Sequence, residues 1–149
     1  MKKLYVVGNK ASKSLSPTIF NYWFRKYNIK ASYGYLELTE KNFHNKIKDI
    51  LEKKDTLGLN VTIPFKNKII KHLGKIDAHA KKIGAVNCVT NKKTINGTNT
   101  DWTGYYKTLP NIKKTKNRKV IILGYGGASH AIHYVLKKRG FKDILIFNR

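Results

Sequence analysis

The C-terminal part of the chain carries the pattern that most limits its fold. Four apolar residues, Val120–Leu123, run directly into a glycine-rich turn, G-Y-G-G, and a helical pattern follows over Ala128–Arg139. Gly140 ends that helix, and a second apolar run covers Ile144–Phe147. Two short buried strands joined by a helix pair in parallel through a right-handed crossover. We therefore predict a βαβ unit in an α/β protein.

The glycine turn of this unit is typical of a dinucleotide site. Glycines directly after a strand let the backbone approach a diphosphate, and the next helix N-terminus supplies N–H groups and a positive dipole end. After the second strand the chain carries Asn148 and Arg149 in place of the acidic residue that binds a ribose 2′-hydroxyl. Arginine suits a 2′-phosphate, so the pattern favours NADP over NAD. A turn that only packs tightly is the alternative interpretation.

The stretch G-L-N-V-T-I-P-F-K, residues 58–66, predicts a ligand-binding edge. Apolar side chains alternate over Leu57–Ile63, which predicts a strand with one buried face, and Pro64 ends it. Asn60, Thr62 and Lys66 then lie at the carboxyl end of a strand, where open α/β sheets bind ligands. For Lys66 alone, a solvated lysine after a turn is the alternative.

Strand and helix patterns alternate through the rest of the chain as well. Alternating apolar residues mark the strands, and apolar residues at helical spacing behind a capping residue mark the helices. We expect strands at Leu4–Gly8 and Ala31–Leu38, a hairpin of Val86–Thr90 and Lys93–Gly97 around Asn91-Lys92, a Ser16-capped helix, a Thr39-capped helix ending at Leu51, and helices at Asn67–Leu73 and Asp77–Ile83.

Two polar segments complete this outline. Gly97–Gly104, G-T-N-T-D-W-T-G, is too small and polar for a core strand, so we expect a loop that presents Asn99, Thr100 and Asp101 before a helix. Pro110–Lys119 is polar and rich in lysine. We expect the boundary between two domains in this second segment.

The charge balance first suggests a polyanion partner. The chain has 31 basic and 8 acidic residues, a formal net charge of +23, and a basic surface attracts nucleic acid. Only four of the basic residues are arginine, and the lysines are spread without a dense block. Because nucleic-acid sites favour arginine, we favour an anionic small-molecule ligand and keep a nucleic-acid-binding protein as an alternative.

Cysteine content and hydropathy indicate the compartment. Cys88 is the single cysteine, so no intrachain disulfide can form and a reducing compartment is expected. The apolar run Leu4–Val7 is too short for a signal peptide, and no later stretch approaches the length of a membrane span. We expect a cytoplasmic protein without a membrane partner.

Two hydroxyl side chains precede the first helix. Ser14 and Ser16 lie where a strand passes into that helix, and hydroxyls at a helix N-terminus can bind a carboxylate. The alternative is that Ser16 serves only as the helix cap.

Five motifs in consistent order resemble one protein family. They cover essentially the whole chain and resemble the amino-terminal part of shikimate dehydrogenase, an NADP-dependent enzyme of aromatic amino-acid and chorismate biosynthesis that reversibly reduces 3-dehydroshikimate. The motifs are G-N-K-A-S-K-S-L-S-P-T-I-F-N from Gly8, N-V-T-I-P-F-K from Asn60, G-A-V-N-C-V from Gly84, G-T-N-T-D-W-T-G from Gly97 and G-Y-G-G-A-S from Gly124.

The resemblance implies the domain organisation. Residues 1–101 form a three-layer α/β substrate domain with a mostly parallel sheet, residues 102–118 a linking helix and connection, and residues 119–149 the start of an NADP-binding Rossmann domain. A dinucleotide fold needs about six parallel strands, so we expect a truncated chain. Because its cofactor sheet has an unpaired edge, we expect it to be inactive or weakly folded alone. The expected oligomeric state is a monomer or homodimer.

The resemblance also implies the roles of site residues. Ser14 and Ser16 would hold the substrate carboxylate, and Lys66 and Asp101 would form the catalytic pair. Asn60 would be only a supporting residue. The hydroxyl and keto side of the ring would contact Thr62, Lys66, Asn87 and Asp101; the diphosphate loop would comprise Gly124, Gly126, Gly127 and Ala128; and Asn148 and Arg149 would begin the segment that selects the 2′-phosphate.

These residue types suit ketone reduction. Hydride transfer builds negative charge on the carbonyl oxygen, and a nearby ammonium can stabilise that charge and donate a proton. A carboxylate beside the amine orients it and favours its charged form. Lys66 and Asp101 fit these two roles.

The chain departs from the family pattern at several positions. Lys10 replaces a usual proline, Lys13 a common histidine, Tyr125 an alanine and His130 a common arginine. With His133, His130 could mimic a metal pair on a helix, but no third ligand is evident, so we expect no metal. A relative that oxidises quinate or another polyol acid, with NAD, is the remaining alternative.

Overall fold

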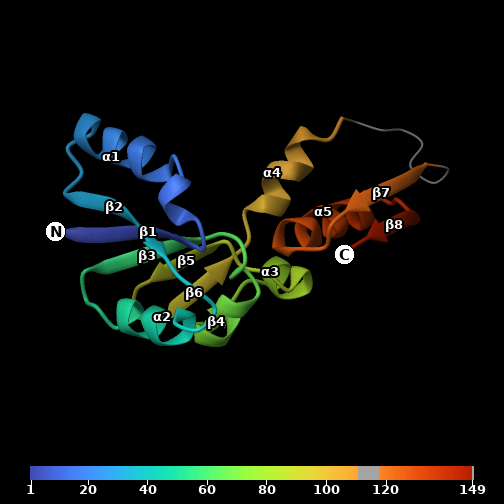
Figure 1. Cartoon of the computed structure of the whole chain (residues 1–149). Coiled ribbons are helices and arrows are strands. Elements are labelled where there is room, and N and C mark those ends of the chain that lie inside the picture. Colours follow the sequence, from blue (N-terminus) through green and yellow to red (C-terminus); the bar gives the residue numbers. More distant parts are fainter. Residues whose placement is uncertain (111–117, 149) are drawn as a thin grey trace.

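The computed structural model describes residues 1–110 and 118–148 (Figure 1). Its elements alternate between strands and helices for most of the chain, as the patterns predict. They are β1 (Lys2–Gly8), η1 (Ala11–Lys13, a 3₁₀ helix), α1 (Ser16–Lys26), β2 (Ala31–Glu37), α2 (Phe43–Leu51), β3 (Thr56–Val61), η2 (Lys68–His72, a 3₁₀ helix), β4 (Lys75–Ile76), α3 (Ala78–Ile83), β5 (Cys88–Asn91), β6 (Ile95–Thr98), α4 (Asp101–Thr108), β7 (Lys119–Leu123), α5 (Gly127–Lys138) and β8 (Asp143–Phe147).

The six N-terminal strands form one mixed, mostly parallel sheet, the large sheet, in the order β2-β1-β3-β5-β6-β4. β1 pairs in parallel with both β2 and β3, and β4 pairs in parallel with β6. β5 runs antiparallel to its two neighbours, β3 and β6. The predicted α/β fold class with a mostly parallel sheet is confirmed, and so is the hairpin of β5 and β6.

Helices cover both faces of the large sheet, with α1 on one side and α2 on the other (Figure 1). Because neighbouring residues of a strand point to opposite faces, Val6 packs with Tyr33 and Phe20 beneath α1, whereas Val7 packs in the larger core beneath α2. In that larger core Phe43 of α2 stacks on Phe65, their ring centroids 4.2 Å apart. The core therefore consists of two layers, one on each face.

The C-terminal residues form the predicted βαβ unit. β7 and β8 pair in parallel over five residue pairs as the small sheet, and α5 packs against one face of it through Ile122, Leu136 and Phe141. α4 lies beside α5 and completes this C-terminal unit (Figure 1). The opposite face of the small sheet is open, with Leu123 81% and Phe147 58% exposed.

Two predicted helix caps are wrong. α1 begins at Ser16 itself, Leu15 occupies the cap position, and no side chain caps the helix; the Ser16 N–H instead donates to the Ser14 hydroxyl, 3.2 Å away. α2 begins at Phe43 rather than after Thr39. A turn precedes it, in which the amide oxygen of Asn42 accepts the Thr39 N–H at 2.9 Å. Residue type alone predicts both caps, but in both cases a neighbour's side chain accepts the N–H of the predicted cap residue itself.

Other boundaries differ in smaller ways. β3 ends at Val61, two residues before the predicted end. Strand β6 includes Gly97 and Thr98, so the predicted loop begins after Thr98; a side chain at Gly97 would collide with Leu73 and Val86. Asp77 caps α3 by accepting two N–H groups, and Gly84 ends that helix at φ +73°. Residues 111–117 of the predicted domain boundary lie outside the described residues.

Candidate functional site

A cavity of about 540 Å³ opens on the α1 face of the large sheet, at the carboxyl ends of β1 and β3. Its wall comes from the segment around η1, the start of α1, the end of β3 with the turn after it, and the residue before β5. Most of the predicted substrate-binding residues meet here, although they are far apart in the chain. They are Ser14, Ser16, Thr62, Lys66 and Asn87, and Asn60 joins them.

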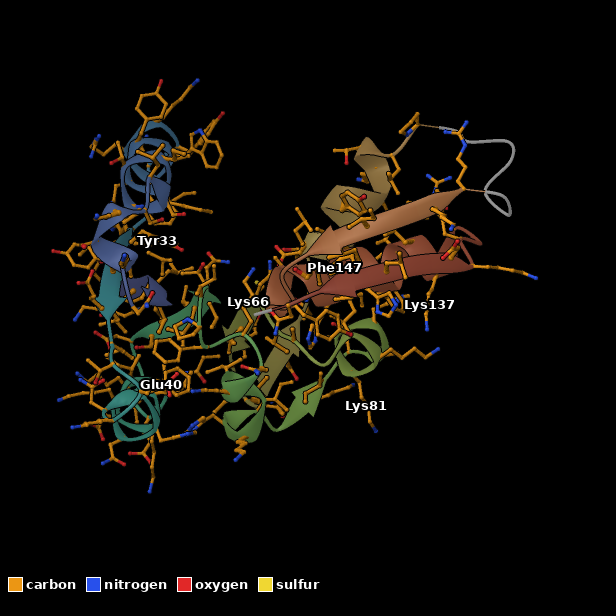
Figure 2. All side chains as sticks on the ribbon, turned by 45° about the vertical axis from the view of Figure 1, so that its right-hand side comes forward. Tyr33, Glu40, Lys66, Lys81, Lys137 and Phe147 are labelled. Carbon is orange, nitrogen blue, oxygen red and sulfur yellow. The ribbon has the colours of Figure 1, made fainter. Side chains whose placement is uncertain are left out.

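Lys66 forms an ion pair with Asp101 at the wall of this cavity. The distance from Lys66 Nζ to Asp101 Oδ2 is 2.7 Å. The side chain of Lys66 is 13% exposed and that of Asp101 is 31% exposed, so the pair is partly shielded from water while still reachable from the cavity. In Figure 2, Lys66 lies where the large sheet faces the C-terminal unit.

Backbone hydrogen bonds fix the turn that carries Lys66. After β3 ends, the Thr62 N–H donates to the carbonyl of Val7, and the Asn9 N–H donates to the carbonyl of Ile63. The Ile63–Pro64 peptide bond is cis. The carbonyl of Lys66 itself accepts the N–H of Val86 at 2.7 Å. Lys66 is thus anchored to the sheet on both sides of the turn.

Two asparagines fix Asp101 opposite Lys66. Asn99, which is only 3% exposed, donates to the carbonyl of Ala85 and accepts the N–H groups of Asp101 and Trp102. Asn87 donates one amide hydrogen to Asp101 Oδ1 at 2.7 Å and the other to Thr100. Each carboxylate oxygen of Asp101 therefore has its own partner, one on Asn87 and one on Lys66.

The cavity carries an excess of positive charge. Lys10 and Lys13 line its outer part together with Ser14 and Ser16, while the charge of Lys66 is balanced by Asp101. Nearby, Ser12 donates to Glu37 through its hydroxyl and its N–H. These bonds, with a smaller contribution from Lys13, hold the pKa of Glu37 below its usual value. Hydroxyls and ammonium groups on one wall suit an anionic group such as a carboxylate.

The glycine turn lies on the other side of Lys66. Gly124 has φ +90°, Gly126 comes just before α5, and no atom lies within 4 Å of a side chain built at either position. Gly127 begins α5 and Ala128 follows in its first turn. The turn therefore leaves open backbone at a helix N-terminus, which fits a diphosphate.

A further cavity of about 500 Å³ lies at the carboxyl ends of β7 and β8, lined by Leu123, Gly124, Phe147 and Asn148. The side chain of Asn148 accepts the N–H of Tyr125 at 3.2 Å, so it shapes the turn. Arg149 lies outside the described residues.

Lys66 is also one of the contacts between the two units. A Cβ atom built on Gly127 would lie 2.8 Å from Lys66 Cβ and 3.1 Å from its Cδ, so the start of α5 lies directly on the lysine stem. A small cavity of about 200 Å³ adjoins this contact, lined by Ile63 and Pro64 on one side and Tyr125 and His130 on the other. One lysine thus borders both the hydroxyl-lined cavity and the glycine turn.

Comparison with known proteins decides the family. Residues 6–89 match the family model described as the shikimate dehydrogenase substrate binding domain. The chain is 38% identical over 157 residues to shikimate dehydrogenase (NADP(+)) of Pelagibacter ubique, covering all of this chain and 57% of that protein. This chain belongs to the shikimate dehydrogenase family. The family predicted from the five motifs is confirmed.

Solved structures of shikimate dehydrogenases share the fold. The enzyme from Aquifex aeolicus superposes with a TM-score of 0.87 at 36% identity, over all of this chain and 56% of that one. The enzyme from Thermus thermophilus in complex with NADP(H) and shikimate gives 0.81 at 26% identity, over all of this chain and 56% of that one. The chain spans a little more than half the length of the shikimate dehydrogenases it matches.

Sequence reasoning missed some residues around this cavity. Tyr33 donates to the Asn60 side chain at 2.6 Å, although the alternation of β2 marks it only as a core aromatic. Asn99 was expected as part of a loop, with no role of its own. The Asn-x-x spacing before α4, which is typical of a side chain capping a helix start, was the one available signal.

Two of the four departures from the family pattern, Tyr125 and His130, lie beside the glycine turn, whereas Lys10 and Lys13 line the hydroxyl-lined cavity. The rings of Tyr125 and His130 lie 4.3 Å apart, and His130 Nδ1 lies 3.1 Å from the carbonyl of Ile83 at the end of α3. His133 lies on the same helix, with a pKa lowered by burial and by nearby Lys137. Among the described residues, no three His, Cys, Asp or Glu side chains are grouped so that they could hold a metal ion.

Proposed function

We propose that these residues form the substrate site of an enzyme that interconverts 3-dehydroshikimate and shikimate with NADPH and NADP. One observation carries the proposal: the Lys66–Asp101 ion pair, 2.7 Å long, stands between a hydroxyl-lined cavity and a glycine turn. An ammonium in this position can reach a ligand in the cavity. Membership of the shikimate dehydrogenase family supports the choice of substrate.

The substrate carboxylate would bind Ser14 and Ser16. Both hydroxyls lie at the start of α1, where the helix dipole favours a negative charge, and Lys10 and Lys13 add positive charge to the same wall. This contact would leave the far side of the ring facing the other wall. Thr62, Lys66, Asn87 and Asp101 would then surround its hydroxyl and keto groups.

Lys66 would donate the proton and Asp101 would orient the amine. As the carbonyl becomes an alcohol, negative charge develops on its oxygen, and an ammonium at hydrogen-bond distance stabilises that charge and donates the proton. Asp101 accepts a hydrogen bond from the amine, and Asn87 holds the carboxylate in place. In the reverse direction the same amine accepts the proton.

The C-terminal unit would hold NADP, which supplies or accepts the hydride when bound. The diphosphate would lie against Gly124, Gly126, Gly127 and Ala128, where the backbone is open and the α5 N-terminus begins. Asn148 and Arg149 would begin the segment that contacts the 2′-phosphate. The relative from Pelagibacter ubique carries NADP(+) in its name, which supports this choice over NAD.

The proposal includes the domain organisation and the setting of the protein. Residues 1–101 would form the substrate domain, 102–118 the link and 119–149 the start of the NADP domain.

We propose a cytoplasmic enzyme, monomeric or homodimeric. None of the helices in the described part of the chain has the length and apolar character needed to cross a membrane. The family match does not favour nucleic-acid binding.

The test is a spectrophotometric assay on the complete reading frame that contains these residues. We expect loss of NADPH absorbance when 3-dehydroshikimate is added, and formation of NADPH from NADP and shikimate. Parallel reactions with quinate in place of shikimate, and with NAD in place of NADP, distinguish this enzyme from the alternative, a relative that oxidises quinate with NAD. Turnover with quinate and NAD but not with shikimate and NADP would contradict the proposal, and so would no turnover with any pair.

A further inference from the structure

Tyr33 connects the core beneath α1 to the wall of the substrate cavity. Its side chain lies on the α1 face of β2 (Figure 2) and is only 3% exposed as a residue. The phenol Oη lies 2.6 Å from Oδ1 of Asn60. Asn60 is on β3, two strands away in the large sheet, and lines the cavity. A buried hydroxyl therefore contacts a cavity residue directly.

The position of Tyr33 is fixed from α1. The Asn21 side chain brackets the backbone of Tyr33, donating to its carbonyl at 2.7 Å and accepting its N–H at 2.9 Å. The ring of Phe20 stacks on the Tyr33 ring, with centroids 4.7 Å apart and planes 9° apart. With its backbone and its ring both held, the phenol has little freedom to leave Asn60.

The contact decides which end of the Asn60 amide faces the ligand. An asparagine amide has an acceptor end and a donor end, and either can point into a cavity. Because the phenol occupies Oδ1, the NH₂ group is the end left for a ligand. Burial raises the pKa of Tyr33 to about 12, against the lowering effect of a hydrogen bond from Ser16. The phenol therefore keeps its proton at any ordinary pH and can donate it to Oδ1 of Asn60.

We propose that Tyr33 is a positioning residue that fixes Asn60 as a hydrogen-bond donor toward the substrate. Asn60 then recognises a ligand oxygen that accepts a hydrogen bond, a carboxylate or alcohol oxygen, and disfavours a ligand that presents only a donor at that point. This inference rests on the proposed function, because it takes shikimate as the ligand. Packing in the core would need only the ring of Tyr33. The inference gives its hydroxyl a role in substrate recognition.

The test is a double-mutant cycle on the protein encoded by the complete reading frame that contains these residues, with shikimate affinity measured by calorimetry. Tyr33→Phe keeps the ring and removes the hydroxyl, and we expect roughly tenfold weaker binding with little change in unfolding temperature. In the Asn60→Ala background the same substitution should change affinity less than twofold, because there is no amide to orient. Tyr35→Phe, an exposed tyrosine on the same strand, is the matched control and should bind as the parent does.

A ligand-free measurement separates this inference from the proposed function. The side-chain carbonyl carbon of Asn60, assigned by its absence in Asn60→Ala, should shift in the NMR spectrum of Tyr33→Phe and not in that of Tyr35→Phe. An unchanged Asn60 signal, or an equal loss of affinity in both backgrounds, would overturn the role of Tyr33. If the parent chain does not bind shikimate while the Asn60 signal does shift, the recognition step fails together with the proposed function, and only the contact between the two side chains stands.

Discussion

Lys66 and Asp101 are 35 residues apart in the chain and meet within 2.7 Å. The meeting depends on two anchored segments, the turn after β3 and the start of α4, each tied to the sheet by backbone or asparagine hydrogen bonds. At the scale of the residue, the site consists of one ion pair and the groups that orient it.

Replacing Lys66 by methionine should remove the proton donor while keeping the length of the side chain. We expect the turnover of 3-dehydroshikimate by the complete enzyme to fall by about 10²–10⁴-fold. Lys68→Met is the matched control, since Lys68 pairs with Glu40 rather than with a cavity residue, and its turnover should stay within about twofold. Equal rates in the two variants would remove Lys66 from the chemistry.

Asn99 should matter for both stability and the position of Asp101. Substitution by alanine leaves the N–H groups of Asp101 and Trp102 and the carbonyl of Ala85 without their partner, at a cost of about 1–3 kcal/mol in the free energy of unfolding. Urea unfolding measures that cost, and shikimate affinity reports on Asp101. A variant as stable as the parent would show that Asn99 does not organise this segment.

Residue types predicted which residues form the site better than they predicted how those side chains are oriented. Ser14, Thr62 and Lys66 come from motifs at the ends of elements, and the fold brings them to one cavity. Tyr33 acts through a hydrogen bond to Asn60 across β1 that depends on how distant strands pair, so local pattern could not assign it. Asn99 binds the N–H groups two and three residues ahead, a local capping pattern, but its bond to the carbonyl of Ala85 depends on the fold.

At the scale of the element, the start of α5 packs directly on Lys66. A methyl group at Gly127 would meet the Lys66 stem at 2.8 Å, so Gly127→Ala must push the helix and the lysine apart. We expect a loss of about 1–3 kcal/mol in unfolding free energy, measured by urea unfolding, together with weaker shikimate binding.

Gly104→Ala supplies the opposite control for this steric argument. Gly104 is in α4, is exposed, and has nothing within 4 Å of a built Cβ. The substitution should therefore raise the unfolding free energy by about 0.5–1 kcal/mol through helix propensity. If both alanine variants shift stability in the same direction, the packing of Gly127 on Lys66 is not the cause.

The contact between α2 and η2 should make stability depend on pH. His44 Nδ1 lies 2.8 Å from His72 Nε2, and burial, with the neighbouring His44, lowers the pKa of His72 below its ordinary 6.5. Since the unfolded chain then binds the proton more readily, the unfolding free energy should decrease as the pH falls below about 6.5 and level off below the folded pKa. Urea titrations at several values between about pH 8 and about pH 5 measure how steeply the unfolding free energy changes with pH.

His72→Gln removes the titrating group from this pair. Its unfolding free energy should change less over the same pH range than that of the parent. An identical slope in both proteins would assign the pH dependence to other groups, such as His133.

Element boundaries show where pattern and structure diverge. The strands other than β4, and α5, were predictable because their apolar residues alternate, form continuous runs or repeat at helical spacing. The starts of α1 and α2 were not, because Ser16 and Thr39 have capping side chains but their own N–H groups are bound by Ser14 and Asn42, which shifts where each helix begins. A helix cap depends on the backbone geometry at a single residue, whereas the buried face of a helix or strand is determined by many residues together.

At the scale of the whole molecule, the large sheet and the C-terminal unit meet at Lys66 and at a cluster of α3, α4 and α5. Ile83, Ala85 and Ala131 are buried in that cluster, with Trp102 and Tyr134 packed against them. His79 adds a polar contact, its Nδ1 2.7 Å from the Tyr134 hydroxyl. These contacts hold the C-terminal unit against the large sheet. Lys66 then lines both the hydroxyl-lined cavity and the small cavity beside the glycine turn.

The net charge of +23 belongs to this scale as well. A positive field attracts small anions as well as nucleic acid, and Lys10 and Lys13 bring part of it to the cavity mouth. The composition alone could not choose between these partners. The placement of two lysines beside Ser14 and Ser16 supports the anionic ligand.

A crystal structure of the protein encoded by the complete reading frame, in complex with shikimate, tests the central claim most directly. We expect the ring in the cavity beneath α1, its carboxylate on Ser14 and Ser16 and one ring hydroxyl within hydrogen-bond distance of both Lys66 Nζ and Asp101. Shikimate bound elsewhere, or Lys66 and Asp101 turned toward different surfaces in a cavity that stays empty at saturating ligand, would contradict it.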